Sequence, residues 1–463
     1  MVKQYMEESF KTIIEPFRIK SIEPLKRTTL AERKAILKEA RLNLFLIKSE
    51  NVLIDLLTDS GTNAMSAEQW AGIMRGDESY AGSPSFLRFE KAAQDITGHS
   101  VVIPTHQGRA SERIVIQSLL KPGQYVLSNT LFDTTRANVE HEQCKVIDLP
   151  CEEAKDTQAQ FPFKGNMNLA IFEEKLKELK SQVGLVVMTL TNNSGGGQPA
   201  DPENVGAVAR LCKAYKIPFM IDGCRFAENA YLVKKRDSRY AHKTAKQIAL
   251  DLFQLADVIT ISAKKDGIAN IGGIICTKNE EWAQGFRNNL ILTEGFPTYG
   301  GLAGRDLEAI AIGMYEALDE DYLQYRIRCI EYMCEGLRKL SVPIVEPAGG
   351  HAIYVDARKF LTHIEPAQLP GQALAVALYE EGGIRSCEIG TSMFGKIVNG
   401  KIEPARQDLV RLAIPRRVYT QSHFDYVIEV FSRIVERKKE MKGMKFTYRP
   451  EALPHFTSHF DWI

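Results

Sequence analysis

The sequence predicts an α/β protein whose central sheet is mostly parallel. Short apolar runs alternate with stretches of helical periodicity through the middle of the 463-residue chain. This alternation is typical of a parallel sheet covered by helices. Several runs end on polar residues, and open α/β sheets bind ligands at the carboxyl ends of their strands. Because the chain is too long for one ordinary core, we expect a large domain and a smaller one.

The clearest predicted unit begins at the apolar run GLVVMTLT, residues 184–191. Its β-branched residues suit a strand that is buried on both faces. A glycine-rich turn follows, after which Asp201 and Pro202 favour the cap and first turn of a helix. The run IPFMID then predicts the next strand, which ends on Asp222.

Further strands are predicted on both sides of this unit. A helix within residues 242–256 leads into the strand DVITISA, residues 257–263, so two crossover units follow one another. Upstream, HSVVIP and GQYVLSN predict two more strands with a helix between them.

The pattern of apolar and charged residues changes after about residue 310, where long charged helical stretches precede the strand-like run DLVRLAI. We interpret this part as a smaller α+β domain that also takes in part of the N-terminal segment. The predicted division is residues 1–57 for an N-terminal arm and part of the small domain, 58–320 for the large domain, and 321–463 for the C-terminal small domain.

Composition excludes several classes of partner. The chain is 44% hydrophobic and 25% charged with a net charge of +1, so it lacks the basic surface that grips nucleic acid. No segment has the length or apolarity of a membrane span or a secretory signal, and we expect a cytoplasmic protein with a small-molecule substrate. The eight cysteines are scattered without zinc-site spacing, which favours reduced core residues.

Two adjacent lysines, Lys264 and Lys265, follow an apolar strand in the stretch ISAKKDGIANIGG. A lysine pair is usually a solvated surface feature. Here it stands beside Ser262 at the end of a buried strand, where an ammonium group without a partner is costly. Lysine with a depressed pKa forms Schiff bases, and the commonest cofactor held in this way is pyridoxal phosphate (PLP).

A PLP site needs a phosphate cradle and a carboxylate for the ring nitrogen. The stretch THQGR supplies Gln107 and Gly108 at a strand-to-helix turn and Arg109 beside them, to which the lysine loop adds Ser262 and Lys264. A carboxylate keeps the ring protonated and therefore a better electron sink. Asp222 is placed for that role, although a structural cap of the next turn is the simpler alternative.

Three other polar residues complete the predicted site. Arg225 and Asn193 follow strands at the same edge of the sheet, where either is a candidate to contact the phenolic oxygen of the cofactor. The substrate carboxylate needs a forked donor, and Arg411 is on the smaller domain, where closure would trap the substrate.

Eleven motifs in one order resemble the PLP-dependent β-eliminating lyases, the family of tryptophanase and tyrosine phenol-lyase. The resemblance runs from about residue 15 to the C-terminus and rests on LLTDSGTNAMS, RGDESYAG, PTHQGR, FDTTR, GGQP, RFAENAY, SAKKDG, NIGG, EGFPTYGGLAGRD, AGGHAIYVDA and RLAIPRRVYT. It implies the aspartate aminotransferase-like fold (fold type I) with a mostly parallel seven-stranded sheet. It also implies a homotetramer built from tight dimers and a requirement for K+.

The resemblance also assigns roles to individual residues. It implies that Lys265 forms the Schiff base and that Lys264 is a cation beside the phosphate. Further implied roles are ring stacking for Phe132, proton transfer near the leaving group for Tyr80, a K+ site at Gly61, Glu78 and Asn270, and contacts to the substrate for Thr58, Ser60 and Phe456.

Three positions distinguish the two named members of the family. At these positions the chain resembles tryptophanase rather than tyrosine phenol-lyase, with Asp133, Ile389 and His455. An apolar Ile389 suits the carbocycle of indole, and Asp133 is placed to accept from the indole N–H or to move a proton. Simple packing roles are the alternatives for Ile389 and His455.

The expected reaction is β-elimination of L-tryptophan to indole, pyruvate and ammonia. Protonation of an indole carbon turns the ring into a leaving group, and this step needs a positioned acid, for which Tyr80 and Asp133 are the candidates. The alternatives are elimination from L-tyrosine or from another aromatic or S-substituted amino acid, an aminotransferase, and a silent PLP-binding scaffold. An intact set of lysine, carboxylate and arginine argues against the scaffold.

Overall fold

The large sheet has seven strands in the computed structural model, which describes residues 12–451 and 453–463. Only β8 runs against its neighbours, so the prediction of a mostly parallel sheet is confirmed. In spatial order the strands are β2 (Val101–Thr105), β8 (Gly273–Thr277), β7 (Val258–Ser262), β6 (Phe219–Asp222), β5 (Val183–Thr189), β3 (Tyr125–Ser128) and β4 (Lys145–Asp148).

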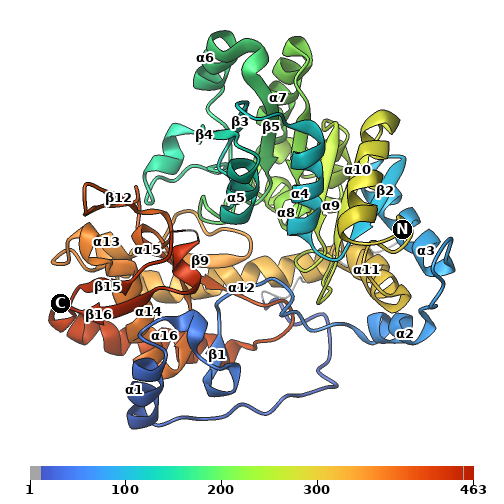
Figure 1. Ribbon diagram of the computed structural model, residues 1–463. Helices are drawn as coiled ribbons and strands as arrows, with labels where there is room; N and C mark the ends of the chain where they lie inside the picture. The colour runs from blue at the N-terminus through green and yellow to red at the C-terminus, as the bar shows by residue number, and fades with distance from the viewer. Residues whose placement is uncertain (1–11, 452) are drawn as a thin grey trace, which may run out of the picture.

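Helices cover both faces of this sheet (Figure 1), because successive strand residues point to opposite faces. Along β5, Val186 and Met188 pack into one core and Leu185 and Val187 into the other. The first core includes α3 (Pro84–Thr97), α6 (Leu169–Leu179), α7 (Pro202–Tyr215), α8 (Phe226–Arg236), α9 (Ala245–Phe253) and α11 (Gly304–Glu316). The second includes α4 (Gly108–Leu119), α5 (Asp133–His141) and α10 (Glu280–Thr293).

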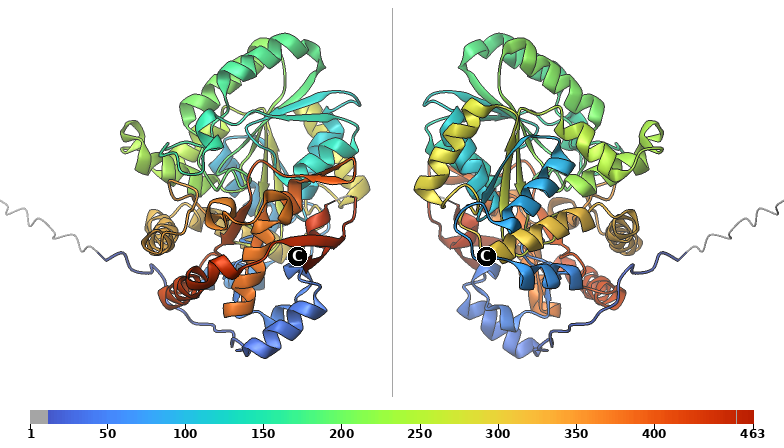
Figure 2. Two further views of the ribbon diagram at one scale, coloured as in Figure 1. Left: turned by 90° about the vertical axis from the view of Figure 1, so that its left-hand side faces the viewer. Right: turned by 90° about the vertical axis from the view of Figure 1, so that its right-hand side faces the viewer.

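A separate hydrophobic core joins the N-terminal segment to the C-terminal third of the chain. Figures 1 and 2 show α1, in dark blue, beside the orange and red C-terminal elements. The helices of this part are α1 (Leu30–Glu39), α12 (Glu320–Lys339), α13 (Ala357–Phe360), α14 (Pro370–Gly382), α15 (Thr391–Phe394) and α16 (Gln421–Arg437). Helix α2 (Ala67–Arg75) lies outside it, against α11.

Short sheets complete this C-terminal part. An antiparallel sheet orders β11 (Cys387–Ile389), β14 (Leu409–Ala413) and β9 (Ala352–Asp356), and it carries Arg411 on its central strand. The remaining pairs are β1 (Ile54–Asp55) with β10 (Ile384–Arg385), β12 (Lys396–Val398) with β13 (Lys401–Glu403), and β15 (Met444–Tyr448) with β16 (His459–Trp462).

The predicted strands and helices around the lysine pair are confirmed. The side chain of Asp201 caps α7 by accepting a hydrogen bond from the backbone N–H of Glu203 (3.0 Å), and Pro202 is the first helical residue. All eight cysteines are free, and Cys329 alone is not fully buried. Among the described residues, no helix combines the length and apolarity that crossing a membrane requires.

Removing the ring of Phe172 tests the core on which α6 packs. This side chain is 0% exposed, and Phe172→Ala is expected to destabilise the protein by about 3–5 kcal/mol because it leaves a cavity. The measurement is the midpoint of urea unfolding. Ile397→Ala, at a side chain that is 49% exposed, is the control and should leave the midpoint nearly unchanged; equal midpoints for the two variants would contradict this packing.

Candidate active site

The predicted cofactor residues meet at the carboxyl edge of the large sheet. Asp222 is the last residue of β6, Ser262 is the last residue of β7, and Gly108 opens α4 just beyond β2. A Cβ atom on Gly108 would lie 2.4 Å from the Cβ of Ser262, so only glycine allows this approach. The backbone N–H of Ser262 donates to Cys224 Sγ (3.1 Å), and that of Cys224 donates to Asp222 Oδ1 (3.2 Å).

Lys265 stands in the turn after β7 and faces the same group of side chains. Burial and the neighbouring Asp222 raise the pKa of the Cys224 thiol well above its ordinary value, and the positive charge of Lys265 acts on the same thiol in the opposite direction. The charges of Lys265 and Asp222 therefore act on the same buried thiol, and their roles toward a cofactor stay predictions.

Three cations gather at the N-terminus of α4 without a carboxylate partner. Burial lowers the pKa of Lys264, and the nearby charges of Lys265 and Arg109 lower it further. Among the described residues, no carboxylate oxygen lies within 4 Å of these three side chains. A helix N-terminus with unpaired cations around it suits a phosphate group, and Gln107 and Ser262 lie beside it.

Arg411 and Asn193 form the opposite side of the site. Nη1 of Arg411 donates to Asn193 Oδ1 (2.9 Å), Nη2 donates to the carbonyl of Leu57 (2.8 Å), and the buried Nε has no partner among the described residues. Asn193 Oδ1 also accepts from the hydroxyl of Tyr354 (3.0 Å) and lies 2.9 Å from His351 Nε2. This arrangement holds the guanidinium in place and leaves one buried donor free.

Two of the three residues predicted to select the aromatic ring of the substrate contact each other. His455 Nε2 lies 3.3 Å from Asp133 Oδ2, and both side chains are buried. Phe132 precedes Asp133 as the cap of α5, and Phe456 stacks against His455 with ring centroids 3.9 Å apart. Ile389 packs in the cluster of β9, β11 and β14, with the half-buried Phe45, Leu57, Met393 and Phe394 against it.

The segment before Ser60 crosses the site. Thr58 Oγ1 accepts a hydrogen bond from the backbone N–H of Ser60 (3.1 Å), and the neighbouring Gly61 donates its N–H to the carbonyl of Lys264 (2.8 Å). Asn270 Nδ2 donates to the carbonyl of Gly61 (3.0 Å), so two members of the predicted K+ site are adjacent.

Other predicted residues lie apart from these groups. Glu78 is largely exposed and pairs with Arg305 (3.0 Å), not with Gly61. Tyr80 is 67% exposed and packs on Phe296 and Tyr299. The described residues contain no group of three or more His, Cys, Asp or Glu side chains arranged to hold a metal ion.

Arg225 is engaged by a carboxylate that the sequence analysis did not single out. It makes two hydrogen bonds to Asp59, at 3.0 Å from Nε and 2.7 Å from Nη2. Although burial alone would raise the pKa of Asp59, Arg225 and then Arg416 hold it well below its usual range. The guanidinium of Arg225 is therefore fixed by an ion pair beside the predicted site.

Comparison with known proteins identifies the family. The model of the β-eliminating lyase family matches residues 55–430. The chain belongs to this family. The lyase is 54% identical to a tryptophanase of Salinibacter ruber (97% of this chain, 95% of the relative) and 53% identical to one of Hyphomonas neptunium (97% and 99%). It is also 43% identical to a tyrosine phenol-lyase of Symbiobacterium thermophilum (97% and 98%).

Solved structures support the predicted fold. The lyase is similar to a serine palmitoyltransferase of Sphingomonas wittichii (TM-score 0.60, 13% identity, covering 89% of this chain and 97% of that one). It is also similar to a SepCysS–SepCysE N-terminal domain complex (TM-score 0.56, 15% identity, 84% and 96%). With the seven-stranded sheet, these likenesses confirm the α/β aspartate aminotransferase-like fold, fold type I.

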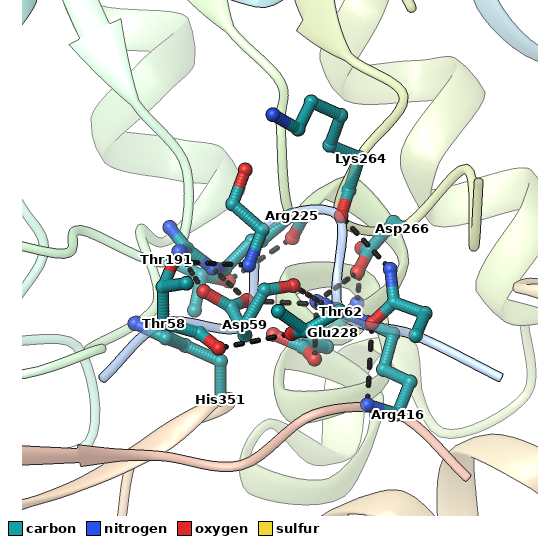
Figure 3. Close-up of polar contacts among 12 residues, drawn as sticks. Thr58, Asp59, Thr62, Thr191, Arg225, Glu228, Lys264, Asp266, His351 and Arg416 are labelled. Atoms are coloured by element: carbon teal, nitrogen blue, oxygen red, sulfur yellow. Dashed lines mark hydrogen bonds and ion pairs between the residues drawn. The ribbon is translucent and has the colours of Figure 1, made fainter. Parts of the chain in front are cut away.

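A buried network of charges below the lysine pair was missed by sequence reasoning. Arg416 is 0% exposed and pairs with Asp59 (3.0 Å), Glu228 (2.8 Å) and Asp266 (2.8 Å), as Figure 3 shows. Arg225 binds Asp59 and Arg326 binds Glu228, so three arginines face three carboxylates. No local motif identifies this network, because its members are far apart in the chain.

The network fixes the loop that carries Lys265. Asp266, the next residue, accepts hydrogen bonds from the backbone N–H groups of Ala227 (2.7 Å) and Glu228 (3.2 Å) at the start of α8. Burial and the nearby Glu228 raise the pKa of Asp266 to about 6, against the charge of Arg416. Figure 3 shows the side chain of Lys264 pointing away from this network.

Arg416→Met tests the network. The variant leaves three buried carboxylates facing two arginines, and it is expected to destabilise this lyase by about 3–5 kcal/mol. The urea-unfolding midpoint measures the loss. Arg433→Met is the control, because Arg433 and Glu429 are about 60% exposed and such pairs contribute about 0–1 kcal/mol. Similar midpoints for both variants would show that the buried network does not hold the fold together.

Proposed function

We propose that this lyase catalyses the PLP-dependent β-elimination of L-tryptophan to indole, pyruvate and ammonia. The observation that carries the proposal is the contact between Asp133 and His455 (3.3 Å). These residues are far apart in the sequence, and both are the residue types that the resemblance to tryptophanase implies at their positions. They meet beside an apolar wall that Phe456 and Phe45 form. The tryptophanases with 53–54% identity over nearly the full chain support the same substrate.

The side chains at the sheet edge suit PLP as the cofactor. Its phosphate fits the unpaired cations Arg109 and Lys264 at the N-terminus of α4, together with Gln107, Gly108 and Ser262. When it is bound, PLP withdraws electrons from the substrate α-carbon and so stabilises a carbanion there. Asp222 would hold a proton on the ring nitrogen, Phe132 would stack on the ring, and Lys265 would attach the cofactor covalently.

The chain's own groups then supply binding and proton transfer. Lys265 would take the proton from the α-carbon, because its amine follows β7 at the same sheet edge as Asp222. Arg411 would bind the substrate carboxylate through its unpartnered Nε, while Asn193 keeps the guanidinium oriented. Arg225 or Asn193 would contact the phenolic oxygen of the cofactor, as predicted.

At the other end of the substrate, Asp133 would accept a hydrogen bond from the indole N–H, while His455 contacts the carboxylate of Asp133. Ile389, Phe456, Thr58 and Ser60 would surround the rest of the amino acid. Release of indole requires a proton at its ring carbon, and Tyr80 or Asp133 would deliver it.

The exposure of Tyr80 and Glu78 supports the predicted assembly. Both side chains lie on one loop and face solvent in the single chain, so a catalytic tyrosine there needs cover. A homotetramer of tight dimers would provide it from a second copy.

The proposal has three further parts. It includes the K+ site at Gly61, Glu78 and Asn270 and a cytoplasmic location. It also includes the division of the chain at residues 57/58 and 320/321, and the presence of two separate hydrophobic cores favours this division.

The lysine pair provides the first test of this proposal. Lys265→Ala is expected to abolish the yellow absorbance of the bound cofactor, because no amine remains to attach it. Lys264→Ala is the matched control, and it should keep the absorbance while the cofactor Kd rises about tenfold or more. Equal loss of absorbance in both variants, or in neither, would refute the assignment.

The substrate provides the second test. Purified protein is incubated with L-tryptophan or L-tyrosine in potassium buffer, and pyruvate is measured together with indole or phenol. We expect indole release with kcat/KM at least about tenfold above that for phenol release, and a lower rate in sodium buffer. Faster release of phenol would establish the tyrosine-specific alternative.

A further inference from the structure

Asn43 is a buried side chain with no role in the proposed function. It is 1% exposed, and its amide joins two segments that are 412 positions apart in the chain. Nδ2 donates to the carbonyl of His455 (3.2 Å) and to the carbonyl of Ser458 (2.8 Å). Oδ1 accepts from the backbone N–H of Phe45 (3.0 Å), so both polar atoms of the amide are bonded inside the protein.

The partners of Asn43 determine which way its amide points. The carbonyls of His455 and Ser458 only accept hydrogen bonds, so a flipped amide would set its oxygen against two other oxygens. Both carbonyls belong to buried residues, where backbone polar groups need partners. Asparagine suits this position because its side chain has two donors at one end and an acceptor at the other.

The acceptor end of Asn43 begins the turn that carries Phe45. Asn43 caps the 3₁₀ turn Leu44–Leu46, because its side chain takes the N–H of Phe45, which has no partner within such a turn. Gln372 on α14 fixes the backbone just before this cap, since its Nε2 donates to the carbonyl of Leu42 (2.8 Å). Two buried side-chain amides therefore hold the chain that leads to the Phe45 ring.

The donor end of Asn43 holds the chain at His455. The imidazole of His455 lies 3.3 Å from Asp133 Oδ2 through Nε2, while its buried Nδ1 has no partner among the described residues. Because the second ring nitrogen is unbonded there, the position of the imidazole depends on its backbone and on packing. Asn43 binds that backbone, and the packing comes from the rings of Phe45 (centroids 5.7 Å apart) and Phe456 (3.9 Å).

We propose that Asn43 is a positioning residue for recognition of the aromatic ring of the substrate. Its acceptor end places Phe45, which belongs to the apolar wall, and its donor end places His455, which contacts the carboxylate proposed to bind the indole N–H. This inference rests on the proposed function and deepens it, since it adds a residue on which recognition of the ring depends. The hydrogen bonds of Asn43 go to backbone atoms, so it acts on the substrate through its two neighbours.

The test compares two substrates that differ in their leaving group. L-Tryptophan releases indole, whereas β-elimination of S-methyl-L-cysteine to pyruvate and ammonia releases methanethiol, which has no ring to position. Asn43→Ala is expected to lower kcat/KM for L-tryptophan about tenfold or more, because Phe45 and His455 lose the amide that places them. The value for S-methyl-L-cysteine, per mole of bound cofactor, is expected to change by less than about twofold.

Asn43→Asp separates the two ends of the amide. The carboxylate still accepts from the N–H of Phe45, but it does not donate to the carbonyls of His455 and Ser458. We expect the loss to be confined to L-tryptophan again. In an enzyme that already carries His455→Ala, Asn43→Asp is expected to lower kcat/KM for L-tryptophan by less than about a further twofold, because the side chain that it positions is absent.

Asn204→Ala is the matched control. Asn204 is a buried asparagine on α7, where Oδ1 accepts from the N–H of Met167 (2.9 Å) and Nδ2 donates to the carbonyl of Met167 (2.9 Å). Its loss also leaves backbone groups without partners, so the midpoint of urea unfolding should fall in both alanine variants. The ratio of the two kcat/KM values should fall only for Asn43→Ala, since neither Asn204 nor Met167 belongs to the site.

The outcomes separate this inference from the proposed function. Equal losses for both substrates in Asn43→Ala, no loss for either, or the same change of ratio in Asn204→Ala overturns the role of Asn43 while tryptophan cleavage stands. A wild-type enzyme that releases no indole removes both. Should Asn43→Ala fail to fold, Asn43→Asp carries the test. Should the wild type not cleave S-methyl-L-cysteine, the His455→Ala background decides, and a fully additive loss there overturns the role.

Discussion

The salt-bridge network around Arg416 is the constraint on which the rest of the site depends. Burial of a single charge is prohibitive, yet here three arginines and three carboxylates are buried together and compensate one another. The members come from the segment before Ser60, from the start of α8, from α12, from the lysine loop and from the chain after β14. One interaction therefore sets the relative positions of the elements that carry Lys265 and Arg411.

The distribution of charge around this network separates a part of the site that suits a phosphate from a part that suits a protonated ring. Cations without partners gather at the N-terminus of α4, where a phosphate group would neutralise them. Asp222 stands at the end of β6, on the other side of this edge, where a protonated heterocycle would balance its charge. The anionic and cationic ends of a cofactor are thus matched by opposite charges on a single sheet edge.

Local pattern was sufficient to predict much of this arrangement. The β-branched run of β5, the Asp201 cap of α7 and the polar residues after β6 and β7 are short-range features, and each was confirmed. Parallel strands bring their carboxyl ends together, so Asp222, Ser262 and Lys265 were expected to meet. The partner of Arg225 was not predicted, because Asp59 lies 166 positions away and no periodicity relates the two.

By itself, the sequence determined the fold class, the order of the strands that carry the lysine and the aspartate, and the resemblance to β-eliminating lyases. These depend on residue spacing and on motifs that are continuous in the chain. Only the tertiary structure decided that Asp133 contacts His455 and that Arg416 is wholly buried among carboxylates. Such contacts join distant segments, and their energies arise from burial and charge compensation that exist only after the chain has folded.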